Sequence, residues 1–278
     1  MTTVCLSFDF DALSIWVSTF KQVSAGPLSR GEYAARVGVG RVLELLAAKG
    51  VQATFFIPAH TAVSFPEQVR SIQRAGHEIA VHGYCHESPV GLLRAEEAAL
   101  LERSVAKLRT VLGSGYQPQG YRSPAADVSS NTIAILEEQG FRYDSSMSAD
   151  DFRPYLARRD DRVDEEGFQP GPLSKVIEIP FNWELDDFPY FQFLNRPLYQ
   201  GLKGTEEVYT AWREEFDHCH GSVEAGVYVL TMHPEIIGRG PRIAMLGRLI
   251  DHMRSRPGVR FATLAAAAAE QAKIRISD

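Results

Sequence analysis

Short apolar segments alternate with longer amphipathic segments along most of the chain. The apolar segments predict strands at 4–12, 53–57, 78–81, a segment ending at 120–124, 176–180 and 227–232. The amphipathic segments carry apolar residues at helical spacing and predict helices at 38–49, 66–75, 95–112, 132–139, 206–219 and 243–254. Strands that alternate with helices over the whole length predict parallel strands, in either a barrel or a doubly wound sheet.

Two segments interrupt this alternation. Residues 13–30 contain the breaker Gly26-Pro27 and are expected to lie over the end of the first strand. Residues 148–175 are charged and rich in Pro and Gly, and we interpret them as a long loop rather than a domain boundary. The 278 residues are an ordinary length for one α/β barrel, so we expect 1–278 to form a single catalytic domain.

The first predicted strand reads VCLSFDFDA and ends in two carboxylates. Side chains alternate along a strand, so Asp9 and Asp11 point to the same side and the apolar residues at 4, 6, 8 and 10 to the other. Neighbouring like charges cost energy, which favours their use for a cation, a proton or a turn. Taken alone, a solvated strand end with an Asx turn also explains the pair.

A histidine pair follows the third predicted strand, in the segment HGYCH. His82 and His86 are four residues apart, a spacing that places both on one face of a helical turn. With Asp11 they form a set of one carboxylate and two imidazoles, which leaves an open position and is typical of catalytic zinc sites. The alternative is a hydrogen-bonded pair near a surface turn. Cys85 is a candidate fourth ligand, but it lies one residue off the shared face.

Other reactive residues also follow predicted strands. Arg122 follows the fourth strand, Trp183, Asp186 and Asp187 follow the strand at 176–180, and His233 follows the strand at 227–232. In a parallel barrel the carboxyl ends of the strands form one mouth, where catalytic groups collect. The alternatives are a solvent ion pair for Arg122 and a capped strand end for His233.

Composition and charge narrow the partners and the compartment. The chain is 45% hydrophobic and 23% charged, and its formal net charge of -6 argues against nucleic acid or an anionic membrane as partner. The sequence has no apolar run long enough to span a bilayer and no secretory pattern at its start, so we expect a cytoplasmic protein. Cys5, Cys85 and Cys219 lack paired spacing, which is typical of free thiols in a reducing compartment.

Six segments resemble the polysaccharide deacetylase superfamily (carbohydrate esterase family 4). They are SFDFDA at 7–12, HGYCHE at 82–87, GYRSPAAD at 120–127, YDSSM at 143–147, IPFNWELDDFPYF at 179–191 and LTMHPEIIGRGPR at 230–242. The resemblance covers nearly the whole chain and is to the branch of peptidoglycan-deacetylase-like proteins, allantoinases and cyclic imidases. The main family motif has two adjacent Asp residues followed by Gly, whereas this chain has Asp-Phe-Asp-Ala, the spacing of that branch.

The resemblance implies a deformed (β/α) TIM-like barrel and a role for each motif residue. Asp9 is then the general base, Asp11 joins His82 and His86 on a divalent metal, which we expect to be Zn2+, and His233 is the general acid. Arg122 would fix Asp9 and keep it ionised. A bound dication lowers the pKa of its water towards about 7 and polarises a carbonyl oxygen, so hydrolysis can proceed at neutral pH.

Three functions remain open on the sequence. The leading one is metal-dependent hydrolysis of a carbon–nitrogen bond in a small cytosolic amide, such as a cyclic imide or a hydantoin-like ring. The second is deacetylation of an N-acetyl amino sugar in a glycan or a precursor. The third is a catalytically silent ligand-binding barrel, which would be expected to have lost some of these groups, and none is missing.

Substrate contacts and assembly form the last expectations. We expect the substrate to contact Tyr121, Pro124, Trp183, Asp187 and Phe188. The aromatic run at 188–193 has more apolar surface than a barrel rim needs, so it is a candidate for a pocket shared with a neighbouring subunit. The resembled branch is commonly oligomeric, and we expect a homo-oligomer, namely a tetramer.

Overall fold

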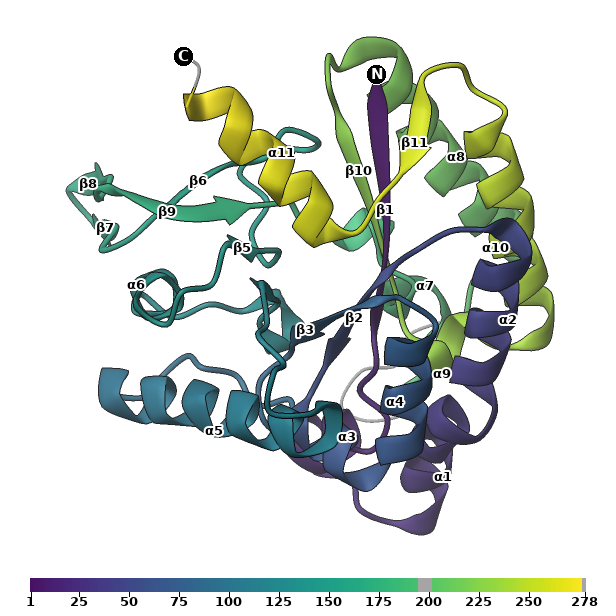
Figure 1. Cartoon of the computed structure of the whole chain (residues 1–278), viewed down its shortest axis with the longest axis horizontal. Helices are drawn as coiled ribbons and strands as arrows, with labels where there is room; N and C mark the ends of the chain where they lie inside the picture. Colours follow the sequence, from purple (N-terminus) through teal and green to yellow (C-terminus); the bar gives the residue numbers. More distant parts are fainter. Residues whose placement is uncertain (195–201, 277–278) are drawn as a thin grey trace.

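A parallel sheet curled into a half-barrel forms the centre of the computed structural model, which describes residues 1–194 and 202–276 (Figure 1). Its strand order is β10-β1-β2-β3-β4-β5-β9-β6. The short strand β11 lies outside this order and pairs with β1, which also pairs with β10 and β2. The strands are β1 Thr2–Asp9, β2 Thr54–Ile57, β3 Glu78–Val81, β4 Gly120–Tyr121, β5 Tyr143–Asp144, β6 Tyr155–Arg158, β9 Leu173–Glu178, β10 Val227–Met232 and β11 Val259–Phe261. Among the described strands of this sheet, β6 alone runs antiparallel, along β9. The predicted deformed (β/α) barrel is confirmed.

Helices cover the sheet and connect its strands (Figure 1). The helices are α1 Ala25–Tyr33, α2 Val39–Lys49, α3 Ala59–Ser64, α4 Pro66–Arg74, α5 Arg94–Leu112, α6 Thr132–Glu138, α7 Phe188–Phe191, α8 Thr205–Ser222, α9 Pro234–Ile237, α10 Gly240–Arg254 and α11 Leu264–Ile276. The six helices predicted from apolar spacing correspond to α2, α4, α5, α6, α8 and α10. Within the described parts of the chain, no helix is long and apolar enough to cross a membrane.

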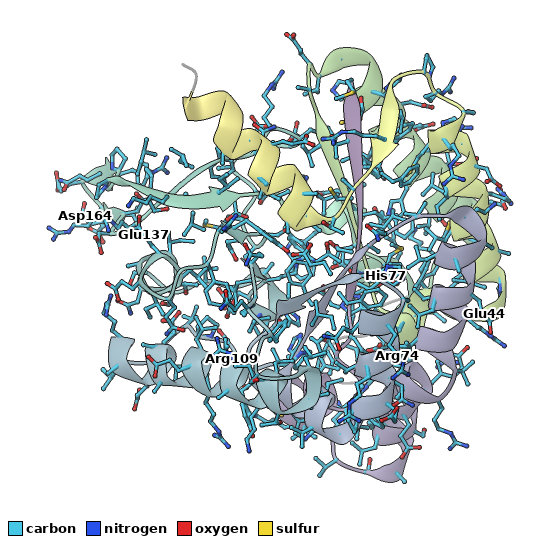
Figure 2. The ribbon with its side chains drawn as sticks, viewed as in Figure 1. Glu44, Arg74, His77, Arg109, Glu137 and Asp164 are labelled. Carbon is cyan, nitrogen blue, oxygen red and sulfur yellow. The ribbon has the colours of Figure 1, made fainter. Side chains whose placement is uncertain are left out.

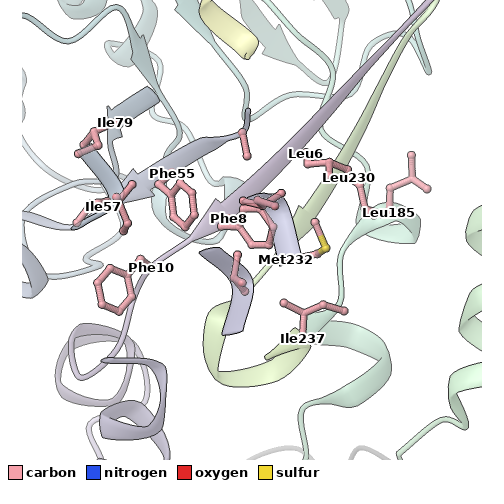
Figure 3. Close-up of a cluster of buried hydrophobic side chains, with 14 of the residues drawn as sticks. Leu6, Phe8, Phe10, Phe55, Ile57, Ile79, Leu185, Leu230, Met232 and Ile237 are labelled. Atoms are coloured by element: carbon pink, nitrogen blue, oxygen red, sulfur yellow. The ribbon is translucent and has the colours of Figure 1, made fainter. Parts of the chain in front are cut away.

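Strand β1 is buried on both faces because each face packs against its own hydrophobic cluster. The alternate residues Val4, Leu6, Phe8 and Phe10 belong to the main core, where Phe8 stacks on Phe55 of β2 at 5.0 Å (Figure 3). The opposite face joins a second cluster that includes residues of α11. Each large apolar side chain buried in this way contributes roughly 1.5–3 kcal/mol. The packing holds β1 rigidly, with its carboxyl end at the site described below.

The predicted loop at 148–175 is wrong in part. It contains β6, a hairpin of β7 Arg162–Asp164 and β8 Gly167–Gln169, and the start of β9. Asp164, at the far edge of the molecule in Figure 2, accepts hydrogen bonds from the backbone N–H groups of Glu166 and Gly167 and so closes the hairpin. Both hairpin strands are exposed, so they lack the apolar alternation by which a buried strand is recognised.

Candidate metal centre and active site

Five buried polar residues from the carboxyl ends of four strands meet at the end of β1. Asp9 ends β1, His82 follows β3 and Arg122 follows β4, while His233 follows β10. Asp11 lies between them, with its carboxylate 3.5 Å from His82 Nε2 and 3.7 Å from His233 Nε2. Parallel strands therefore bring together groups that are far apart in the sequence.

Asp11, His82 and His86 have donor atoms that all lie within 4.8 Å of one another. The Nε2 atom of His86 is 3.4 Å from Asp11 Oδ2. Each imidazole uses its other nitrogen in a hydrogen bond, His82 Nδ1 to the Arg122 carbonyl and His86 Nδ1 to Thr19 Oγ1, both at 2.7 Å. These bonds orient both rings and leave each Nε2 directed at Asp11, as in many histidine metal ligands.

The electrostatics of this group fit a divalent ion. Both carboxylate oxygens of Asp11 are buried and have no hydrogen-bond partner among the described residues. Burial raises the pKa of Asp11 to about 6 and lowers the pKa of His86 to about 4, which leaves neutral imidazole available at pH 7. A buried carboxylate without a partner is costly, and a cation would remove that cost. Cys85 is not part of this group of donor atoms.

The two histidines converge through a tight turn and not through a helical turn, so that part of the prediction is wrong. Gly83 and His86 both have positive φ, 67° and 61°. The Glu87 carboxylate accepts hydrogen bonds from the backbone N–H groups of Tyr84 and Cys85 at 2.8 and 2.6 Å. A glycine favours such a backbone, whereas a histidine with positive φ is uncommon and is held there by its surroundings.

The position of Asp11 depends on a second turn. Its carbonyl accepts hydrogen bonds from Ser14 Oγ at 2.7 Å and Thr61 Oγ1 at 2.6 Å, and Ala12 has a φ of 49°. A Cβ atom added to Gly31 of α1 would lie 2.4 Å from the Ala12 carbonyl oxygen. Helix α1 can therefore pack on this turn only because residue 31 is a glycine.

Arg122 holds Asp9 in its ionised form. Its guanidinium donates to Asp9 Oδ1 at 2.8 Å and to Ser7 Oγ at 3.0 Å, and its Nε donates to the Ser145 carbonyl at 2.9 Å. Burial raises the pKa of Asp9, but the nearby Arg122 and His82 bring that pKa below its usual value. Asp9 is therefore a carboxylate at neutral pH and can accept a proton.

His233 is hydrogen-bonded to Asp187, and Asp186 lies beside it. Its Nδ1 is 2.7 Å from Asp187 Oδ1, and its backbone N–H donates to the same carboxylate. Burial lowers the pKa of His233, but Asp186 and Asp187 raise it well above its usual value. Its Nε2 faces Asp11, so a protonated His233 presents a proton to the same space as the metal-binding group.

A cavity of about 360 Å3 opens over these residues. Its floor is polar and contains Asp9, His82, His86, Arg122, Asp186 and His233, and its walls are Ile15, Thr19, Phe20, Ala125, Ala126, Phe181, Trp183, Phe188, Pro189 and Leu194. Trp183 and Phe188 thus lie where they were predicted. Of the other expected contacts, Asp187 lies behind His233, and Tyr121 and Pro124 are not among the lining residues.

Several wall residues were not singled out by the sequence. Ile15, Thr19 and Phe20 belong to the segment 13–30, which was expected to lie over the carboxylates, but no motif distinguished them. Leu194 reaches the cavity beside Ile15. These contacts form between segments far apart in the chain, so local spacing carries no sign of them.

Comparison with known proteins identifies the family. The polysaccharide deacetylase model matches residues 26–143. A peptidoglycan deacetylase from Helicobacter pylori is 32% identical over 273 residues, which are 94% of this chain and 92% of that protein. The chain belongs to the polysaccharide deacetylase family. It is accordingly a hydrolase of carbon–nitrogen bonds other than peptide bonds.

Solved structures of this family have the same fold. A Mycobacterium smegmatis protein classed with the polysaccharide deacetylases has a TM-score of 0.85 and 34% identity, over 99% of this chain and 91% of that one. The allantoinase PuuE, at 23% identity, has a TM-score of 0.77 over 96% of this chain and 89% of that one. The second likeness concerns the fold alone.

A buried carboxyl pair lies behind Arg122 and was not predicted. Asp144 and Glu178 are both fully buried, and Ser146 Oγ donates to Asp144 while its backbone N–H donates to Glu178. Burial raises the pKa of Asp144 to about 6 and that of Glu178 well above its usual value, so the pair retains a proton near neutral pH. The backbone carbonyl of the adjacent Ser145 accepts a hydrogen bond from Arg122, so the pair helps to fix the position of that guanidinium group.

The Asp187→Asn variant is expected to shift the alkaline limb of the kcat/KM profile to lower pH. If His233 acts as the acid, activity is lost as pH rises through the His233 pKa, which Asp187 raises. Removing the negative charge of Asp187 lowers the pKa of His233, so activity is lost at a lower pH. The matched control is Asp217→Asn, since Asp217 pairs with the remote His252. An alkaline limb that stays in place in Asp187→Asn would contradict this role.

Proposed function

We propose that this chain hydrolyses a carbon–nitrogen bond in a small amide, such as a cyclic imide or a hydantoin-like ring, with the help of a divalent metal ion. The observation that carries the proposal is the size and lining of the cavity above the metal-binding group. Its volume of about 360 Å3 suits a small molecule, and its walls are largely apolar.

The aromatic walls favour a compact ring over a sugar chain. Phe20 and Phe188 stack with centroids 6.1 Å apart, and Phe188 meets the His233 ring edge-on at 5.3 Å. A flat ring can pack against such faces, whereas the many hydroxyl groups of a glycan need hydrogen-bonding partners. The polar lining groups lie on the floor, where the reacting amide would be.

The residues in and below the cavity floor have proposed roles. Asp11, His82 and His86 would hold the ion, for which we propose Zn2+, and a bound dication supplies a nucleophile at neutral pH and polarises the carbonyl group. Asp9 would accept the proton of the attacking water. Arg122 keeps Asp9 ionised and oriented, and a protonated His233 would donate its proton from Nε2 to the departing nitrogen.

A substrate comparison tests this proposal. Purified protein with added zinc is incubated with succinimide, hydantoin, allantoin and N-acetylglucosamine oligomers, and ring opening or acetate release is measured. We expect turnover of at least one of the ring compounds and little release of acetate. Efficient deacetylation of the oligomers without turnover of any ring would contradict the assignment to small amides.

The second candidate is deacetylation of an N-acetyl amino sugar. It is favoured by the 32% identity to the peptidoglycan deacetylase of Helicobacter pylori over most of both chains. The acetamide group presents the same kind of carbonyl and nitrogen to Asp9 and His233. A catalytically silent barrel is disfavoured, because the metal-binding group, Asp9, Arg122 and His233 are all in place.

We also propose a cytosolic homo-oligomer, namely a tetramer. The three cysteines are free, which suits a reducing compartment such as the cytosol.

Exposed aromatic side chains support the proposed assembly. Trp183 at the cavity mouth and Phe193 are 47% and 41% exposed, and a neighbouring subunit could cover them. In the run at 188–193, Phe191 is already buried within the chain. Light scattering at micromolar concentration is expected to give a tetrameric mass, and a monomeric mass would refute the assembly.

A further inference from the structure

A second, smaller pocket lies between α1, α9, α10 and the segment that follows α7. Its volume is about 130 Å3, and it shares no lining residue with the catalytic cavity. It is lined by Arg30, Phe191, Gln192, Phe193, Leu202, Glu235, Arg239 and Arg242. Arg30 of α1 and two arginines at the start of α10, Arg239 and Arg242, thus surround a space the size of one small functional group.

Aromatic rings and backbone carbonyls hold two of these guanidinium groups in place. Arg239 lies over the Tyr33 ring at 4.0 Å, and its Nε donates to the Glu235 carbonyl at 3.0 Å. Arg242 lies over the Phe191 ring at 4.5 Å and donates to the carbonyls of Phe191 at 3.4 Å and Ile236 at 3.3 Å. Stacking of this kind restricts each planar group and leaves its remaining N–H donors free for a ligand.

Arg30 completes the cluster from α1. It lies over the Trp16 ring at 4.8 Å and makes no hydrogen bond or ion pair within residues 1–194 and 202–276. Burial lowers the pKa of Arg30, and the like charge of Arg239 lowers it further. The pKa of Arg242 is lowered by burial, raised by Asp187, and lowered again by its two arginine neighbours. The three guanidinium groups therefore repel one another in the pocket.

The three pocket arginines form no direct ion pair with a carboxylate in the described chain. Elsewhere exposed arginines pair with carboxylates, as Arg248 does with Glu206 at 2.6 Å. Within the part of the chain that the structure describes, none of the three pocket arginines has a carboxylate oxygen within 4.0 Å. Glu235 lines the pocket, but it is 4% exposed and its Oε2 has no hydrogen-bond partner among the described residues. Burial raises the pKa of Glu235 to about 8, so this carboxyl group is mostly uncharged at pH 7 and offsets little of the positive charge.

We propose that this pocket binds an anionic group of a small molecule, either a carboxylate or a phosphate. Guanidinium groups recognise both anions with paired N–H donors, and several donors converge here. The volume admits one such group and excludes an extended glycan. The site is independent of the proposed catalytic function, although α9 begins directly after His233 and joins the two regions.

Binding of inorganic phosphate and of succinate, measured by calorimetry on the whole protein at constant ionic strength set with chloride, tests the site. We expect saturable binding of at least one anion at one site per chain, weakened about tenfold or more in Arg30→Gln and in Arg239→Gln. Phosphate binding alone would indicate a phosphate ester as ligand, and succinate binding alone a carboxylate.

The matched control is Arg248→Gln, which removes an equal charge from α10 outside the pocket. It should leave the binding unchanged. Circular dichroism checks that each variant is folded, and Arg30→Gln is the mildest change because Arg30 makes no hydrogen bond within the described chain. The proposal would be overturned if neither anion bound saturably. It would also be overturned if Arg30→Gln and Arg239→Gln bound the anion as tightly as the unmodified protein, or if Arg248→Gln lost as much affinity as they do.

Discussion

Asp11→Asn, His82→Ala and His86→Ala should each lose the bound divalent ion and turnover together. The three side chains supply the converging donor atoms, and the carboxylate of Asp11 accepts no hydrogen bond from the described residues. Loss of an outer partner of a metal ligand already costs about 10- to 100-fold in affinity, so loss of a ligand should cost more. Elemental analysis of the purified variants, together with kcat on the substrate found in the screen, checks this prediction.

The control for the histidine variants is His252→Ala. His252 belongs to α10 and pairs with Asp217 at 2.9 Å, away from the donor group. It should retain about one ion per chain and full turnover. If His82→Ala and His86→Ala both keep the ion content of the unmodified protein, the proposed metal site is wrong.

Asp9→Asn is expected to keep the ion and lose turnover by about 10²- to 10⁴-fold, the usual effect of removing a general base. Asp9 is not in the group of converging metal donors, and its Oδ1 is engaged by Arg122 at 2.8 Å. Asn keeps the shape of the side chain but cannot accept a proton as a carboxylate does. Metal content and kcat are compared with those of Asp11→Asn.

The stability of Asp9→Asn must be measured alongside its activity. Arg122 is fully buried, and removing the charge of its partner is costly, with typical losses of about 3–5 kcal/mol when such a pair is broken. Its hydrogen bonds to Ser7 and Ser145 remain and reduce this cost. If Asp9→Asn is folded but metal-free while Asp11→Asn retains the ion, the two carboxylates have the opposite roles.

Much of the fold follows from the sequence because buried strands and amphipathic helices leave a periodic pattern. The helices α2 and α5 and the strand β10 were predicted almost to the residue for this reason. The hairpin β7–β8 was missed because both its strands are solvent-exposed. The turn at 82–86 was misread because a positive φ at His86 depends on the Glu87 contacts and not on local propensity.

The candidate site was predictable where its residues occur in motifs at strand ends. Asp186 and Asp187 illustrate the limit, because adjacent residues in extended backbone point in opposite directions and the sequence alone does not fix which one faces the cavity. In the structure Asp186 lines the cavity and Asp187 binds His233. The walls formed by Phe20 and Leu194 and the arginine pocket depend on contacts between distant segments, which leave no local pattern.

Metal removal and restoration on a single preparation tests the central claim most directly. The turnover of the best ring substrate is measured on the purified protein, after a chelator has removed the ion as verified by elemental analysis, and again after one equivalent of zinc per chain is added. The account predicts that hydrolysis is lost when the ion is removed and returns when zinc is added. The His86→Ala variant should be inactive from the start, and added zinc should not restore its turnover. Undiminished hydrolysis by the verified metal-free protein would contradict it.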